Sequence, residues 1–125
     1  MNGKKPVERR KHKRFQVPSG TFVALFPDYI KAGQVSNISM GGLAFTYFAD
    51  QEPPNRSFEL EILLHASAFN LQGVPFRTIS DFETEDVPLS STSKRRCAVQ
   101  FGHLTPHQMS QLEYLIQNYA VGEAT

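Results

Sequence analysis

Alternating apolar and polar positions predict a body built from short β-strands. Residues 21–26 are rich in aromatic and β-branched side chains and lie between two turn compositions, which is typical of a strand. Residues 58–64 alternate apolar with acidic side chains, the period of two that marks a strand with one buried face. Four side chains of this stretch are therefore expected to point inward: Phe58, Leu60, Ile62 and Leu64. Further strands are expected over 29–35, 43–48, 69–79 and 96–101.

Polar and glycine-bearing stretches separate these segments. Residues 36–42 predict a polar connection, and residues 81–93, acidic and then rich in Ser and Thr, predict a surface loop. Gly73 and Pro75 indicate a bulge or an edge position within 69–79. In the last strand, Cys97, Val99 and Phe101 are two residues apart, so they are expected to share one face.

A terminal helix is predicted over about residues 105–120. Thr105 is a good N-cap, Pro106 suits the first helical position, and Gln108 completes a capping box. Gly122 is placed to end the helix. Between the capping box and Gly122, apolar residues lie at spacings of three or four: Met109, Leu112, Leu115, Ile116 and Tyr119. Six or seven short strands and one helix favour an antiparallel β-barrel or sandwich whose open side the helix covers.

Length and composition narrow the class of protein further. A chain of 125 residues is one domain by length, and its hydrophobic fraction of 40% is typical of a packed globular protein. No apolar run approaches the roughly 20 residues of a membrane helix, and charge replaces a hydrophobic signal region near residue 1. The single cysteine, Cys97, agrees with a reducing compartment. We therefore expect a cytoplasmic protein without a membrane segment.

Positive charge is concentrated at the start of the chain. Seven basic residues and Glu8 give the first fourteen residues a charge of +6, so the other 111 must carry −5 to reach the total of +1. These fourteen residues also lack hydrophobic periodicity. The sequence therefore predicts a flexible basic arm over 1–14 and a folded body over 15–125. Such an arm indicates an anionic partner.

Two groups of residues could carry the chemistry of binding. Arg10 and Arg14 in the arm each have a planar guanidinium group, which can donate two parallel hydrogen bonds to a phosphate or to the O6/N7 edge of guanine. Lys11, His12 and Lys13 between them are interpreted as solvated spacers. The run Lys94, Arg95 and Arg96 is interpreted as the solvated start of a strand, with an extension of the anionic site or a contact with a partner as alternatives.

The second group lies in the turn before the third strand. Asn37 and Ser39 could contact a base, and Gly41 and Gly42 could let a ligand approach the backbone. The structural alternative is that Asn and Ser satisfy their own turn while the glycines supply positive φ.

Together the two groups resemble the PilZ domain, the bacterial receptor module for cyclic di-GMP. Arg10-x-x-x-Arg14 is followed after 22 residues by Asn37-x-Ser39-x-x-Gly42 leading into an apolar strand. Residues 8–10, 35–39, 98–101 and 104–106 also resemble the family pattern. The resemblance implies a six- to seven-stranded antiparallel barrel with a C-terminal helix, and cyclic di-GMP as the ligand, without a further cofactor or a metal.

The resemblance also implies roles for individual residues. Arg10 and Arg14 would contact phosphates and guanine Hoogsteen edges, and Asn37 and Ser39 the other edge of a guanine. Gly42, beside Gly41, would shape the turn. Many members of the family have Asp where Asn37 stands, and Asn lacks the charge that favours guanine N1–H and N2–H₂. Arg9 is similar to the residue that members binding an intercalated ligand dimer use for stacking.

A non-enzymatic mechanism follows, since no catalytic constellation is present in the sequence. The arm would order over the barrel when the anionic ligand binds, and an unidentified effector protein would bind the ordered arm. Two alternatives stay open. One is a small nucleic-acid-binding barrel, which the acidic body and the lack of an aromatic stacking platform argue against. The other is a degenerate PilZ protein that acts only as a protein adaptor.

Overall fold

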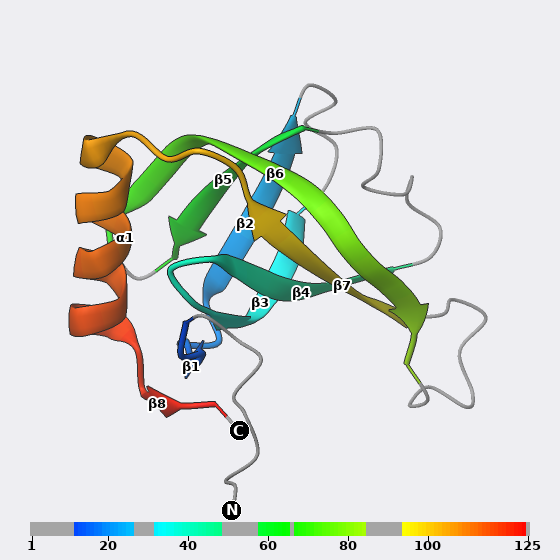
Figure 1. Cartoon of the computed structure of the whole chain (residues 1–125). Helices are drawn as coiled ribbons and strands as arrows, with labels where there is room; N and C mark the ends of the chain where they lie inside the picture. Colours follow the sequence, from blue (N-terminus) through cyan, green and yellow to red (C-terminus); the bar gives the residue numbers. More distant parts are fainter. Residues whose placement is uncertain (1–11, 27–31, 49–57, 66, 85–93, 125) are drawn as a thin grey trace, which may run out of the picture.

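The computed structural model describes residues 12–26, 32–48, 58–65, 67–84 and 94–124. Within these ranges the chain forms eight strands and one helix (Figure 1). In chain order they are β1 (Phe15–Gln16), β2 (Thr21–Phe26), β3 (Ala32–Ile38), β4 (Gly42–Phe48), β5 (Glu59–Leu64), β6 (Asn70–Glu83), β7 (Lys94–Phe101), α1 (Pro106–Tyr119) and β8 (Gly122–Glu123).

Six of the strands close into an antiparallel barrel. Their order is β2-β5-β6-β7-β4-β3, and β3 pairs back onto β2 to complete the circle. The long β6 pairs with β5 over residues 70–75 and with β7 over residues 76–83, and the other edge of β7 pairs with β4 along nearly its whole length (Figure 1). The predicted fold, an antiparallel barrel with a C-terminal helix, is confirmed.

Two short strands, β1 and β8, lie outside the six-stranded ring and were not predicted. One edge of β3 pairs with β2 over residues 32–34 and with β1 at Asn37 and Ile38. The other edge of β1 pairs with β8, so the beginning of the described chain lies between β3 and the C-terminal strand. This arrangement fixes the residues that follow the basic arm against the strand that carries Asn37.

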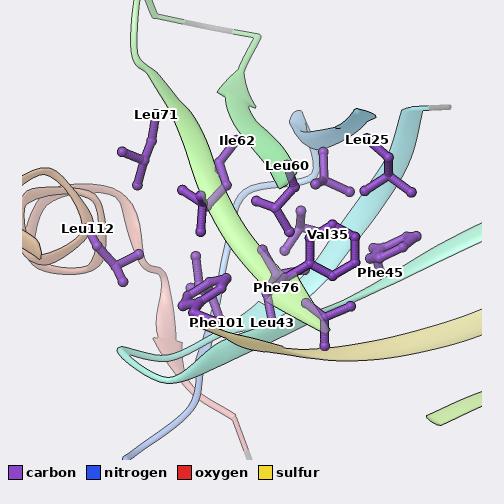
Figure 2. Close-up of a cluster of buried hydrophobic side chains, with 14 of the residues drawn as sticks. Leu25, Val35, Leu43, Phe45, Leu60, Ile62, Leu71, Phe76, Phe101 and Leu112 are labelled. Carbon is purple, nitrogen blue, oxygen red and sulfur yellow. The ribbon is translucent and has the colours of Figure 1, made fainter. Parts of the chain in front are cut away.

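The core fills the barrel and continues under the helix. Aliphatic and aromatic side chains from every barrel strand meet inside it, and Leu112 of α1 extends the cluster (Figure 2). Cys97, Val99 and Phe101 all point inward, as predicted. Of the four residues expected to point inward from 58–64, Phe58 does not, because it lies before β5 at the rim of the barrel and is 61% exposed.

The helix has the predicted capping box. The Thr105 hydroxyl accepts from the Gln108 backbone N–H, and the Gln108 side chain accepts from the Thr105 N–H. Gln108 Nε2 also donates to the carbonyls of Gln72 and Gly73 at 3.0 Å, which ties the helix start to β6. Leu112 and Leu115 are fully buried, while Met109 is exposed.

Some boundaries differ from the prediction. Residues 36–38 continue β3, so the turn shortens to 39–41, and residues 81–83 belong to β6 instead of a loop. The helix ends at Tyr119 with Ala120 in an extended conformation, so Gly122 belongs to β8 and does not end the helix. Gly73, at φ +68°, occupies the predicted bulge between β5 and β6.

The division into an arm over 1–14 and a body over 15–125 stays a prediction, since residues 1–11 lie outside the described ranges. Among the described residues, no helix has the length and apolar character needed to cross a membrane.

Candidate ligand-binding site

An open groove of about 650 Å³ lies on the outer face of the barrel wall formed by β3, β4 and β7. It is lined by His12 and Arg14, by residues 37 and 39–44, by Ile79 and by residues 98–102. Gly42 opposes Gln100 and Ala44 opposes Ala98 in the β4–β7 register, so small residues form much of its floor. A groove of this size suits a small-molecule ligand.

Asn37 lies in the groove because β3 contains a bulge. Val35 opposes Phe45, but Asn37 opposes Ala44, which leaves Ser36 as an extra residue in β3. In a regular ladder Asn37 would oppose inward-facing Leu43; the extra residue turns it to the outer face. Ile38 takes the inward position and is fully buried. The Asn37 amide has no hydrogen-bond partner among the described residues, so its donors and acceptor can serve a ligand.

Ser39 builds the turn that follows Asn37. Its hydroxyl accepts from the backbone N–H groups of Gly41 and Gly42 at 3.0 and 3.2 Å, and it donates to the Gly42 carbonyl at 3.3 Å. The Ser39 N–H donates to the same carbonyl at 2.8 Å. The residue is buried, so these bonds hold the 39–42 turn in one conformation.

Gly41 and Gly42 are needed for close approach and not for backbone conformation. Among the described glycines only Gly73 has positive φ, so the expectation of positive φ in this turn is wrong. A Cβ on Gly42 would lie 2.1 Å from the Val99 carbonyl oxygen, and one on Gly41 would lie 2.6 Å from the His12 ring. Gly42 lets β4 and β7 pair, and Gly41 lets His12 lie over the turn.

Arg14 reaches the groove from the residue before β1. Phe15 opposes Ile38, so one step further in this register Arg14 comes opposite Ser39. Its carbonyl accepts from the Ala124 N–H at 2.8 Å, which anchors it to the C-terminal segment. Of the predicted site residues, the structure thus brings together Arg14, Asn37, Ser39, Gly41 and Gly42. Arg9 and Arg10 lie outside the described residues.

The two described arginines of the run 94–96 have different environments. Arg95 points to the inner face, where its Nε donates to Asp81 Oδ1 at 3.0 Å and the Tyr47 hydroxyl donates to Asp81 Oδ2 at 2.6 Å. Arg96 is on the outer face, and its Nη1 donates to the Ser36 hydroxyl at 3.3 Å. Arg95 is therefore part of a structural cluster, while Arg96 lies two residues along β7 from Ala98 of the groove floor.

Burial changes the acid–base properties of the inner cluster. Burial, followed by the hydrogen bond to Asp81, raises the pKa of Tyr47 to about 12. Burial, followed by the negative charge of Asp81, raises the pKa of Cys97 to about 12. The bond to Asp81 also raises the pKa of Arg95. Tyr47 and Cys97 therefore stay protonated at neutral pH, and Cys97 is not a reactive thiol.

Several groove residues were not predicted from sequence. His12, interpreted as a solvated spacer, lies against Gly41, and Met40, Ile79, Ala98 and Gln100 also line the groove. Alternation in β7 contained the signal for Ala98 and Gln100, since both lie between inward-facing neighbours. Ile79 had no such signal, because it is the extra residue of a bulge between β6 and β7.

Known structures identify the fold. No family model matches the chain, and no curated protein sequence matches it. The cyclic di-GMP complex of MrkH from K. pneumonia superposes with a TM-score of 0.67 and 15% identity, over 90% of this chain and 52% of that one. YcgR from Escherichia coli in complex with cyclic di-GMP gives 0.66 and 19%, over 89% and 46%. The PilZ domain of YcgR with cyclic di-GMP gives 0.62 and 16%, over 90% and 92%.

The described barrel and helix thus form the fold of a small β-barrel ligand-binding module. The PilZ domain of YcgR shares this fold, so the predicted resemblance is confirmed at the level of the fold. The chain spans about half the length of MrkH and of the YcgR complex, and most of the isolated YcgR domain.

Proposed function

We propose that the chain is a receptor for cyclic di-GMP, which binds in the groove beside Arg14 and Asn37. The observation that carries the proposal is the gathering of Arg14, Asn37 and the Ser39 turn around one groove. The fold is shared with MrkH and YcgR, whose solved complexes contain this ligand. We infer a non-enzymatic role for this chain, in which binding itself is the signal.

The chemistry of the groove suits a cyclic dinucleotide. Two phosphates need cationic donors, and Arg14, together with Arg10 and Arg9 of the arm, would supply guanidinium forks. Two guanines need edge contacts and apolar surface. The Asn37 amide would bind a base edge, while the half-buried Ala98 would offer apolar surface for a ring.

In this proposal the residues of the turn have separate roles. Asn37 is a direct contact, whereas Ser39 and Gly42 act mainly by shaping the turn and the floor beneath the ligand. Gly41 keeps His12 close to the ligand. Arg9 would determine whether a second, intercalated ligand molecule binds, since a guanidinium can stack on a base.

The signal would pass through the arm. Its seven cations repel one another, and a doubly anionic ligand would relieve that repulsion and order the arm over the groove. Because β1 is paired on both edges, the end of the arm is already held beside Asn37. An effector protein would then recognise the ordered arm together with the ligand-filled groove.

Calorimetric titration with cyclic di-GMP tests the proposal, and Lys13 provides a matched control. Arg14→Ala should weaken binding by about 10- to 100-fold, the loss expected for a bidentate contact. Lys13→Ala removes the same charge one residue away, from an exposed side chain that lies 3.9 Å from Glu123 and does not line the groove. It should weaken binding less than about threefold.

The competing functions give different results in the same experiment. RNA and GTP are titrated as controls. A nucleic-acid-binding barrel would bind RNA with an affinity that falls steeply as salt rises, and it would not prefer cyclic di-GMP over GTP. Absence of heat with all three ligands would indicate a protein adaptor that has lost the ligand. Equal losses for Arg14→Ala and Lys13→Ala would contradict the proposed site. The stoichiometry reports whether one ligand molecule or an intercalated pair binds.

A further inference from the structure

We propose that Gln100 selects guanine over adenine in this groove, and that Arg77 is the positioning residue that gives it this selectivity. The inference rests on the proposed function, because it concerns the same ligand and the same groove. Neither residue belongs to the Arg10–Arg14 motif or the Asn37–Gly42 motif, although Gln100 lies in the stretch 98–101 that also resembles the family pattern. Both lie on the outer face of the barrel wall, in β7 and β6.

Three cross-strand neighbours define the geometry. Gly42 of β4, Gln100 of β7 and Arg77 of β6 oppose one another in a single row. Gln100 and Gly42 line the groove. On one side of Gln100 stands the long side chain of Arg77, and on the other side Gly42 has no side chain. The groove therefore lies on the Gly42 side of Gln100, and the Arg77 side chain occupies the other side.

Hydrogen bonds from Arg77 fix which atom of the Gln100 amide faces each side. Arg77 Nε and Nη2 donate to Gln100 Oε1 at 3.0 and 2.7 Å. A guanidinium has donors only, so the amide atom that faces it must be the oxygen. The Nε2 group therefore points away from Arg77, toward the side of Gly42. Among the described residues, Nε2 has no hydrogen-bond partner, so its two N–H donors are available to a ligand.

This orientation changes what a glutamine can recognise. A glutamine with both amide atoms available binds adenine bidentately, accepting from N6–H₂ and donating to N7. In Gln100 the acceptor is occupied by Arg77, so only the donor remains. Guanine presents two acceptors, O6 and N7, on the same edge, whereas adenine places its N6–H₂ donor where guanine has O6. The available N–H group therefore suits guanine and opposes the amino group of adenine.

Affinities for cyclic di-GMP and cyclic di-AMP, measured by calorimetry, test the inference. Gln100→Ala should weaken cyclic di-GMP binding by about tenfold and cyclic di-AMP binding far less. Arg77→Met releases the Gln100 oxygen, so cyclic di-AMP should bind at least about threefold more tightly than it does to the wild type. Gln117→Ala, on an exposed position of α1, is the matched control and should change neither affinity.

The outcomes separate this inference from the proposed function. If the wild type binds cyclic di-GMP and Gln100→Ala has the same affinity for it as Gln117→Ala, the inference about Gln100 is wrong while the proposed function stands. Unchanged discrimination in Arg77→Met, with unfolding midpoints matching the wild type, overturns the role of Arg77. Failure of the wild type to bind cyclic di-GMP overturns both. The side chains of Gln100 and Arg77 are both exposed. If their hydrogen bonds were only structural, the variants would lower the unfolding midpoint and leave the preference for guanine over adenine unchanged.

Discussion

Arg95 and Arg96 are neighbours on β7, and they point to opposite faces of the barrel wall. Arg95 faces inward, where the carboxylate and carbonyl of Asp81 accept its N–H groups and Tyr47 completes the cluster. Each strong donor and acceptor of this cluster has a partner within the chain. Such a partly buried network contributes to the stability and specificity of the fold, and it leaves little hydrogen-bonding capacity for a ligand.

Arg96 faces outward, where it donates a hydrogen bond to the neutral Ser36 hydroxyl. The outer face also carries the Asn37 amide without a partner among the described residues, and Gln100 with an unused donor group. Polar groups with spare hydrogen-bonding capacity around one groove are what a ligand requires. The difference between the faces separates side chains that hold the barrel together from those available for binding.

The largest expected effect is on the inner face and appears at alkaline pH. Tyr47 and Cys97 have folded-state pKa values of about 12, against ordinary values of 10.0 and 9.0. The unfolded chain therefore releases these protons at lower pH than the folded chain does. Their stabilising contribution is complete below about pH 9 and is lost as pH rises toward 12. We expect the free energy of unfolding to fall by about 4 kcal/mol between pH 8 and pH 11.

Urea denaturation at several pH values measures this loss, and two variants apportion it. Tyr47→Phe should reduce the alkaline loss by about 1 kcal/mol at pH 11, and Cys97→Ala by about 3 kcal/mol. Both variants should keep the wild-type affinity for cyclic di-GMP, because neither residue lines the groove. An alkaline slope that neither variant changes would contradict the assignment of this loss to the inner face.

The next effect tests whether an outer-face residue can also be structural. Gly42→Ala places a Cβ 2.1 Å from the Val99 carbonyl oxygen, so β4 and β7 must separate or shift. We expect a loss of about 3 kcal/mol in the free energy of unfolding, measured in urea. Gly122→Ala is the matched control, since its Cβ would meet no atom within 4 Å, and it should change stability by less than about 0.5 kcal/mol. If Gly42→Ala and Gly122→Ala lowered the free energy of unfolding equally, close approach of β4 and β7 at Gly42 would not be needed for stability.

Much of the fold could be predicted because most strands follow a period of two. The alternation of 58–64 and 96–101 locates two barrel strands, and the capping residues Thr105 and Gln108 locate the start of the helix. The strands β1 and β8 contain two residues each, too few for any periodicity. β1 forms through pairing with β3, and β8 forms through pairing with β1, so both depend on the tertiary structure.

The site could be predicted in part, and the bulges explain the remainder. Ser39 and Gly42 are recognisable as turn residues, but their bonds and close contacts require the positions of β4 and β7. The buried pair Val35 and Ile38, three residues apart, does break the period of two and indicates a bulge in retrospect. The separate environments of Arg95 and Arg96 depend on which residues of β6 lie opposite, and the second bulge in β6 sets that register.

The smallest expected effect separates two residues of one motif. Asn37→Ala removes an amide without a partner among the described residues, so stability should change by less than about 0.5 kcal/mol. Affinity for cyclic di-GMP should fall about tenfold, or about 1.4 kcal/mol. Ser39→Ala leaves the N–H groups of Gly41 and Gly42 without their acceptor and should lower the free energy of unfolding by about 1 kcal/mol.

Calorimetry and urea denaturation of the same two variants show whether each residue contacts the ligand or stabilises the fold. If Asn37→Ala lowers stability as much as Ser39→Ala and leaves affinity unchanged, Asn37 belongs with the structural residues and the outer face loses its main ligand contact. Asn37→Asp adds negative charge at the same position, which favours the N1–H and N2–H₂ donors of guanine, so it should strengthen binding. A stronger complex with Asp and a weaker one with Ala would place a guanine edge at Asn37, because a purely structural side chain has no reason to respond in opposite directions.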